Sequence, residues 1–159
     1  MKEFTLLDNF DLLDSESQYL IHKAKEAAAN AYAPYSKFFV GAALLLEDGS
    51  VVAGNNQENA AYPSCMCAER VALYAASTLH HDLKITKLAV VARKSHGKEL
   101  LPAAPCGSCR QVLLEYEVRQ QKPFQIVMQD QDHHWVIAAS AKSLLPFCFT
   151  IENLAHHTH

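Results

Sequence analysis

Between Asp14 and Pro34, hydrophobic residues recur every three or four positions, and this spacing predicts an amphipathic helix. Asp14–Ser15 opens this helix, with Gln18 in position for a capping box, and Pro34 ends it. Two further helices are expected at about 66–78 and 106–118. Two short helical pieces are expected near the end of the chain, at 144–146 and after Thr150.

Apolar and β-rich runs predict five strands, at about 38–46, 51–54, 88–92, 124–128 and 135–138. Asp48-Gly49 is typical of a tight hairpin turn and joins the first two strands. Helices that alternate with strands imply a layered structure. The predicted fold class is therefore α/β, a three-layer α/β/α sandwich with a five-stranded mixed sheet.

No linker, repeat or low-complexity tract divides the chain, so we expect a single domain over residues 1–159. Within it, residues 1–14 form an N-terminal extension, and the His-rich segment 155–159 is expected to be a flexible tail rather than a metal site. The chain has 50% hydrophobic residues, which excludes a mostly disordered protein.

The charge balance limits the partners that the chain can bind. Lys and Arg number 14 and Asp and Glu number 17, for a formal net charge of −3, which argues against a nucleic acid polymer as partner. The longest strongly apolar run, 38–46, is too short to cross a membrane. The N-terminus also lacks the pattern of a secretory signal, so a cytoplasmic protein is expected.

Five cysteines in a cytoplasmic protein favour metal binding or chemistry over disulfides. Cys106 and Cys109 are three residues apart at the start of a predicted helix, so both can touch one metal; alone, the pair could equally be a redox dithiol or two buried thiols. Cys67, at the start of another predicted helix, offers a third thiolate. Glu69 is better placed beside the metal than on it, which predicts an open three-cysteine Zn²⁺ site with an adjacent carboxylate.

Neighbouring residues leave alternatives open. Cys65 could be the fourth ligand of a closed, structural zinc site, although it would not easily face the same point as Cys67. We expect Cys65 and Cys148 to be buried structural thiols. Arg70 is placed either to donate a hydrogen bond to a thiolate or to form a surface salt bridge.

An open zinc site with a carboxylate suits hydrolysis. Zinc-bound water becomes a nucleophile near neutral pH, and a nearby carboxylate can carry its proton. Hydrolytic deamination needs both functions, because hydroxide attacks an amidine-like carbon and a proton must reach the ring nitrogen and then the leaving ammonia.

Six segments together carry a resemblance to a known family. They are Tyr32-Ala33-Pro34-Tyr35-Ser36-Lys37-Phe38, Val40-Gly41-Ala42-Ala43-Leu44, 56–63 (NQENAAYP), 67–70 (CAER), 105–111 (PCGSCRQ) and 144–149 (LLPFCF). This combination is similar to the small, homotetrameric, zinc-dependent cytidine deaminases of the cytidine/deoxycytidylate deaminase superfamily. It covers the chain from about Ser15 to Leu154.

The resemblance implies roles for individual residues. One zinc ion per chain would be held by Cys67, Cys106 and Cys109, with Glu69 as the proton shuttle and Arg70 supporting the thiolates. The implied substrate contacts are Asn56 and Glu58 to the ribose 3′-hydroxyl, Phe38 to the pyrimidine ring and the Ala68 backbone to the base. In a homo-oligomer, expected to be a tetramer, a neighbouring subunit would contribute Ala60, Tyr62 and Phe149.

The activity that the resemblance implies is hydrolytic deamination of cytidine and deoxycytidine to uridine and deoxyuridine, with release of ammonia, in pyrimidine salvage. Many related deaminases have His as the first ligand, and Cys67 in that place favours a free nucleoside as substrate. Glu58 is costly to bury without a donor such as a ribose hydroxyl, although the segment 56–58 could also be a plain polar loop. Two alternatives stay open, namely a deaminase of another cytosine-containing molecule such as blasticidin S, and a binding module held by structural zinc.

Overall fold

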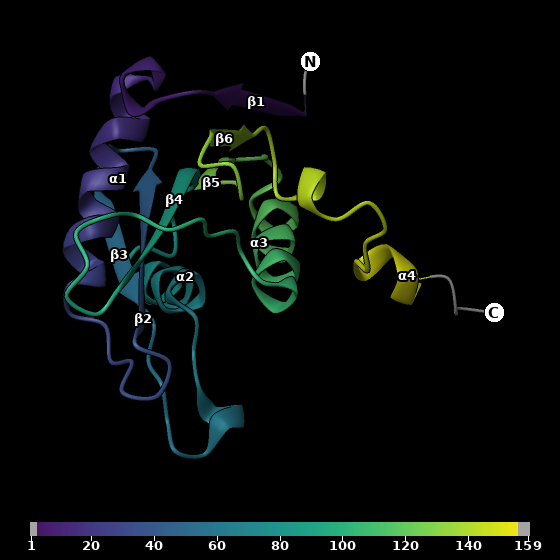
Figure 1. Ribbon diagram of the computed structural model, residues 1–159. Helices are drawn as coiled ribbons and strands as arrows, with labels where there is room; N and C mark the ends of the chain where they lie inside the picture. The colour runs from purple at the N-terminus through teal and green to yellow at the C-terminus, as the bar shows by residue number, and fades with distance from the viewer. Residues whose placement is uncertain (1–2, 156–159) are drawn as a thin grey trace.

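The structure, a computed structural model, describes residues 3–155, and a mixed sheet of six strands forms its centre (Figure 1). The strands are β1 (Phe4–Leu7), β2 (Phe38–Leu46), β3 (Val51–Asn55), β4 (Ile85–Lys94), β5 (Gln125–Gln129) and β6 (Trp135–Ala138). Their order across the sheet is β1-β6-β5-β4-β2-β3. The β4–β5 pair is parallel and the other neighbouring pairs of this sheet are antiparallel.

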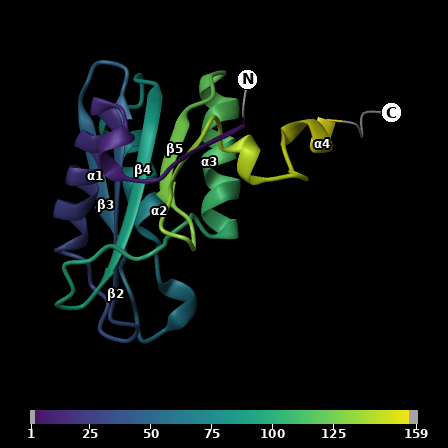
Figure 2. The same cartoon turned by 45° about the horizontal axis from the view of Figure 1, so that its top comes forward.

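Four α-helices accompany the sheet: α1 (Ser15–Ala28), α2 (Ala68–Leu79), α3 (Gly107–Gln120) and α4 (Ile151–Ala155). Short 3₁₀ turns lie at Phe10–Leu12, Tyr62–Ser64 and Lys142–Leu144. The short helix α4 ends a segment that extends away from the body of the molecule (Figure 2). In the described part of the chain, no helix is long and apolar enough to cross a membrane.

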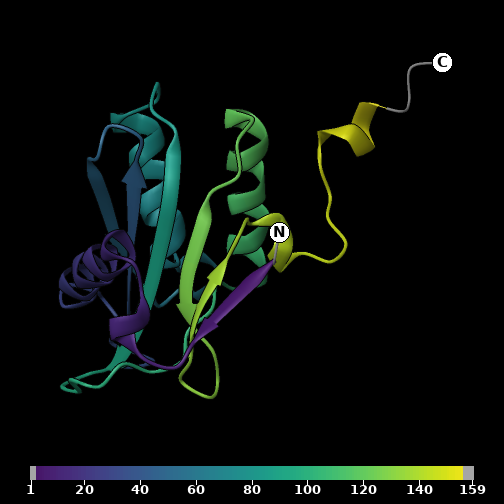
Figure 3. The ribbon, with the colours of Figure 1, turned by 90° about the horizontal axis from the view of Figure 1, so that it is seen from above.

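The helices cover the sheet on both faces, as the view from above shows (Figure 3). One core lies between the sheet and α1, around Leu20 and Ile21, and the other lies between the sheet and the helices α2 and α3, around Leu73 and Leu113. The prediction of a mixed α/β fold is confirmed, with its helices on either side of the sheet. The single-domain assignment stays a prediction, and residues 156–159 of the expected tail lie outside the described residues.

The predicted number of five strands is wrong, because the sheet has six. The additional strand, β1, lies in the segment expected to be an N-terminal extension and pairs antiparallel with β6, from Phe4 opposite Ala138 to Leu7 opposite Trp135. It is a four-residue edge strand with largely exposed side chains. Its pairing partner lies at the other end of the chain, so no local alternation marks it.

The start of α1 also differs from the predicted capping box. Asp14 is the N-cap residue, and its Oδ1 accepts a hydrogen bond from the Ser17 N–H at 2.9 Å. The Gln18 Nε2 instead donates to the carbonyl oxygens of Phe10 and Leu13. Because the N-cap is Asp14 rather than Ser15, Gln18 lies one position beyond the third residue of the helix that a capping box uses, and it anchors the preceding turn instead.

Helix α1 is fixed to the sheet by an ion pair. Lys87 on β4 has a side chain only 6% exposed, and its Nζ donates to Asp14 Oδ1 at 2.8 Å and to Ser17 Oγ at 3.1 Å. Burial raises the pKa of Asp14, but the hydrogen bonds from Lys87 and Ser17 outweigh it and lower this pKa to about 2. The pair therefore holds the first turn of α1 against the middle of the sheet.

Two glycines let the helices approach the sheet closely. A Cβ atom at Gly41 would lie 1.9 Å from the Ala24 carbonyl oxygen of α1, and one at Gly54 would lie 2.6 Å from the Ala72 nitrogen of α2. No larger residue fits at either place without moving backbone. The contact at Gly54 sets the depth of α2, whose N-terminus carries the cysteine and glutamate described next.

Candidate metal centre and adjoining cavity

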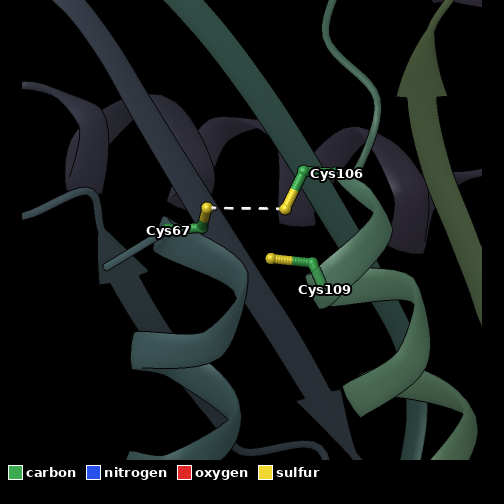
Figure 4. A group of neighbouring side chains, drawn as sticks. All are labelled: Cys67, Cys106 and Cys109. Carbon is green, nitrogen blue, oxygen red and sulfur yellow. Dashed lines mark hydrogen bonds between the residues drawn. The ribbon is translucent and has the colours of Figure 1, made fainter. Parts of the chain in front are cut away.

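Three cysteine thiols converge where α2 and α3 begin (Figure 4). Cys67 is the N-cap residue of α2, Cys106 is the N-cap residue of α3, and Cys109 lies in the first turn of α3. The sulfur atoms of Cys67 and Cys106 are 3.7 Å apart, and all three sulfur atoms lie within 4.8 Å of one another. A proline precedes each helix. Pro105 lies directly before the N-cap of α3, and Pro63 lies in the 3₁₀ turn that leads to α2.

The thiols fit one zinc ion. Tetrahedral zinc with Zn–S bonds of about 2.3 Å keeps its thiolates about 3.8 Å apart, close to the observed separation of Cys67 and Cys106. Neither of these N-cap side chains makes a capping hydrogen bond to the first-turn amides of its helix, so both sulfurs are available to the cluster. Within the described residues Cys65 is not part of the group, so a tetrahedral ion there keeps one open position.

The charge of the cluster is stabilised from one side by Arg70. Its Nη2 donates a hydrogen bond to the Cys67 sulfur at 3.4 Å. Of the two roles that the sequence left open for Arg70, the structure thus shows the contact to a thiolate rather than a surface salt bridge. A hydrogen bond with the Cys109 thiol lowers the pKa of Cys67 to about 5. Burial acts in the opposite direction, and the hydrogen bond from Arg70 helps to outweigh it. The bond between the two thiols raises the pKa of Cys109. In the metal-free protein the negative charge of this pair of thiols is therefore favoured on Cys67, next to Arg70.

Glu69 lies beside the thiols in the first turn of α2 and is only 4% exposed. Burial raises its pKa to about 7, and the negative charge of Cys67 acts in the same direction. A carboxyl group with a pKa near neutrality can both accept and release a proton at physiological pH. Glu69 therefore has the position and the proton affinity that a shuttle needs.

A cavity of about 550 Å³ opens in front of Glu69 and Cys67. This volume lies within the range of sites for small molecules. The four residues predicted to contact a substrate, Phe38, Asn56, Glu58 and Ala68, all line the cavity. Another part of the wall, residues 102–104, was not predicted, because this segment has no pattern that distinguishes it from any other loop before a helix.

The polar side chains at the mouth of the cavity are bonded to the chain itself. Asn56 Oδ1 accepts from the Val40 N–H at 2.8 Å, and its Nδ2 donates to the Phe38 carbonyl oxygen at 2.9 Å. Glu58 accepts from the N–H groups of Tyr35 and Ser36. Glu58 is partly exposed, and the loop before Phe38 already supplies it with donors from within the chain, so its contact to a ribose hydroxyl stays a prediction.

The residues expected from a neighbouring subunit lie at different places. Tyr62 is 70% exposed, lines the cavity of its own chain and packs edge to face on Tyr35, with ring centroids 5.8 Å apart. Ala60 and Phe149 are exposed, and neither belongs to the cavity wall in the described part of the chain. The Phe149 carbonyl oxygen accepts a hydrogen bond from Gln111 on α3. The contribution of these three residues to the site of a neighbouring subunit therefore stays a prediction.

The two remaining cysteines are not the fully buried thiols that were expected. Cys65 is partly exposed and lines the cavity, where the Asn59 N–H donates to its sulfur at 3.3 Å. Cys148 is also partly exposed and packs against the core below α2 and α3. Local sequence gives no burial pattern for either residue, since both lie in irregular segments.

Comparisons with known proteins agree with this geometry. Residues 14–122 match the family model of the cytidine and deoxycytidylate deaminase zinc-binding region. The cytidine deaminase of Halalkalibacterium halodurans is 41% identical over 140 residues, which are 87% of this chain and 98% of that protein. The enzyme of the same name from Mycobacterium tuberculosis is 46% identical over 103 residues, which are 65% of this chain and 73% of that protein. The crystal structure of cytidine deaminase from Burkholderia pseudomallei superposes with a TM-score of 0.68 at 41% identity, covering 86% of this chain and 100% of that one.

Proposed function

The chain belongs to the cytidine and deoxycytidylate deaminase family, and we propose that it catalyses zinc-dependent hydrolytic deamination of cytidine and deoxycytidine, releasing ammonia. The observation that carries this proposal is the meeting of Cys67, Cys106 and Cys109 with the buried carboxyl group of Glu69 at one end of a cavity. A three-ligand site beside a carboxylate is the arrangement that hydrolytic zinc enzymes use.

The chemistry divides between the metal and Glu69. Cys67, Cys106 and Cys109 would hold the zinc ion, and the chemistry that it would supply is a water molecule activated near neutral pH. Glu69 would carry two protons in turn, the first from the attacking water to the ring nitrogen N3, and the second from the hydroxyl group added at C4 to the amino group, which leaves as ammonia. Burial raises the pKa of Glu69 in the metal-free protein and also separates its carboxyl group from bulk water, so the protons that it carries stay inside the site.

We assign substrate binding to the cavity wall. Phe38 would pack on the pyrimidine ring, and the backbone of Ala68, in the first turn of α2, would contact the base. Glu58 keeps lone pairs free to accept from a ribose 3′-hydroxyl, and Asn56 keeps one N–H. The position of these two side chains at the cavity mouth supports a substrate that carries a sugar.

Two other functions compete with this one. A deaminase of blasticidin S would use the same zinc chemistry with the same cavity, but Asn56 and Glu58 on the cavity wall can bond a ribose hydroxyl and so favour the nucleoside. A structural zinc module would need a fourth protein ligand, and within the described residues the group offers three.

Parallel assays separate these possibilities. Purified protein is incubated with cytidine, deoxycytidine and blasticidin S, while ultraviolet absorbance and ammonia are followed and zinc per chain is measured. We expect one zinc per chain and a higher kcat/KM for the nucleosides than for blasticidin S. A preference for blasticidin S would overturn the substrate assignment, and full zinc with no turnover on any substrate would support the structural module.

We further propose that the chain acts as a cytoplasmic homo-oligomer, a tetramer by resemblance, in pyrimidine salvage. Support for oligomerisation comes from the projecting C-terminal segment, whose Phe147 is 96% exposed and which continues with the exposed Phe149, Ile151 and Leu154 (Figure 2). Apolar side chains gathered in this way favour a protein surface over water. Light scattering coupled to size exclusion would give the mass of the assembly, and a monomer at micromolar concentration would contradict the proposal.

A further inference from the structure

The loop between Pro34 and β2 is tied to the mouth of the cavity through the side chain of Ser36. Its hydroxyl donates a hydrogen bond to Glu58 Oε1 and accepts one from the Phe38 N–H at 3.1 Å. The N–H groups of Tyr35 and Ser36 donate to Glu58 Oε2 at 2.8 and 3.2 Å. One hydroxyl therefore joins the carboxylate assigned to the sugar and the backbone of the residue assigned to the base.

This arrangement orders a side chain that would otherwise be mobile. A partly exposed glutamate has many rotamers, and fixing it in one of them has an entropic cost. In this chain the donors from Tyr35 and Ser36 meet that cost before any substrate binds. The hydrogen bond from Ser36 also holds the pKa of Glu58 below its ordinary value, so the carboxylate stays an acceptor.

The backbone of the same loop adopts a left-handed conformation at one residue. Lys37, between Ser36 and Phe38, has a φ of +57°, in the left-handed region that residues with a side chain adopt rarely. Its own N–H donates to the Ala33 carbonyl oxygen at 3.1 Å, so the turn is held at its far end as well. A strained residue persists where its surroundings fix it, and here the fixed elements are the bonds of Ser36 to Glu58 and Phe38.

We infer that Ser36 is a positioning residue that sets selectivity for the sugar. By holding the Glu58 carboxylate beside the Phe38 wall, it lets the site distinguish nucleosides with a 3′-hydroxyl from those without one. The inference rests on the proposed function, because it assumes that Glu58 faces the ribose of a bound nucleoside. It adds to that function a residue of the cavity wall whose hydroxyl acts through Glu58.

The test compares two substrates that differ by one hydroxyl, cytidine and 3′-deoxycytidine. In Ser36→Ala we expect kcat/KM for cytidine to fall about tenfold, mostly through KM, because a hydrogen bond to a charged group is lost. For 3′-deoxycytidine kcat/KM should fall by less than about twofold, since this substrate has no 3′-hydroxyl to donate a hydrogen bond to Glu58. Ser36→Thr keeps the hydroxyl and should restore most of the difference between the substrates.

A matched control comes from another serine. Ser50 Oγ donates to Asp48 Oδ1 at 2.6 Å in the hairpin turn between β2 and β3, and neither residue lines the cavity. Ser50→Ala removes the same kind of bond and should leave both kcat/KM values as in the wild type. Thermal unfolding of each variant checks folding, and Ser36→Cys, a weak donor of similar size, should give an intermediate loss if Ser36→Ala does not fold.

The possible failures are distinguishable. Equal losses of kcat/KM on both substrates in the Ser36 variants, or no loss on either, would overturn the positioning role while leaving the deaminase proposal intact. A wild-type protein that carries zinc but does not deaminate cytidine would overturn the proposed function, and this inference with it.

Discussion

Three helices begin against the same sheet, but their N-termini are built differently. Helix α1 starts at Asp14, which caps its first turn and pairs with the buried Lys87. Helices α2 and α3 start at Cys67 and Cys106, whose side chains make no cap hydrogen bond. An Asp or Ser cap typically stabilises a helix by about 0.5–2 kcal/mol, so α2 and α3 lack this stabilisation while their N-termini face a metal cluster. The comparison separates a helix start that serves stability from two that serve chemistry.

The largest expected effect comes from changing an uncapped start. In Cys106→Ser we expect zinc per chain to fall well below one, activity to be lost and the unfolding temperature to drop, because metal binding and folding are coupled. Serine is a better N-cap residue than cysteine, so the loss cannot come from a weakened helix start. Metal analysis and calorimetry check this, with Cys148→Ser, outside the cluster, as the control that should keep its zinc.

A full complement of zinc in Cys106→Ser would contradict the ligand assignment. So would an equal loss of zinc in Cys148→Ser, because that would point to a general effect of removing a thiol.

A change at the capped start of α1 should lower the stability of the protein and leave its zinc content and activity unchanged. In Lys87→Met the Asp14 carboxylate loses its partner, and we expect the free energy of unfolding to fall by about 2 kcal/mol, less than for a fully buried pair because Asp14 is half exposed. Zinc per chain and kcat should stay unchanged at temperatures where the variant is folded. Denaturant titration and activity assays check both parts. A loss of kcat in fully folded protein would contradict the view that the start of α1 serves stability alone.

The smallest expected effect is a pH dependence at the same place. Asp14 has a folded pKa of about 2, below its unfolded value, so its contribution is complete above about pH 4 and is lost as the pH falls toward 2. Asp14→Asn keeps a good N-cap but removes the charge, so it should be about 1 kcal/mol less stable than the wild type at pH 6, allowing for solvent screening. The two proteins should converge near pH 2, and a difference that stays constant with pH would show that the charge is irrelevant.

Sequence reasoning succeeded where the signal is local. The apolar run of β2 and the strand β6 have the predicted bounds, because each is a continuous run between turn residues. The three thiols could also be anticipated, since Cys106 and Cys109 are one helical turn apart and Cys67 opens another predicted helix. The structure adds how the sheet places the two helices, so that the three sulfur atoms lie within 4.8 Å of one another.

The missed features depend on contacts between distant parts of the chain. Strand β1 exists only through its pairing with β6, and the wall segment 102–104 is held in place by the bridge between Ala103 and Gln129 of β5. The donors of Glu58 come from a loop more than twenty positions earlier, so its partial exposure could not be read from its neighbours in sequence. Hydrogen-bond partners of this kind follow from tertiary structure, not from spacing.

The central claim is that an open zinc site at two uncapped helix starts works together with Glu69 as its proton shuttle. It is tested most directly by measuring zinc content and cytidine turnover on the same sample of Glu69→Gln. Glutamine keeps the shape of the side chain but cannot carry the proton, so we predict one zinc per chain and a kcat reduced by about 10²–10⁴-fold. Turnover close to that of the wild type in the zinc-loaded variant would contradict the account.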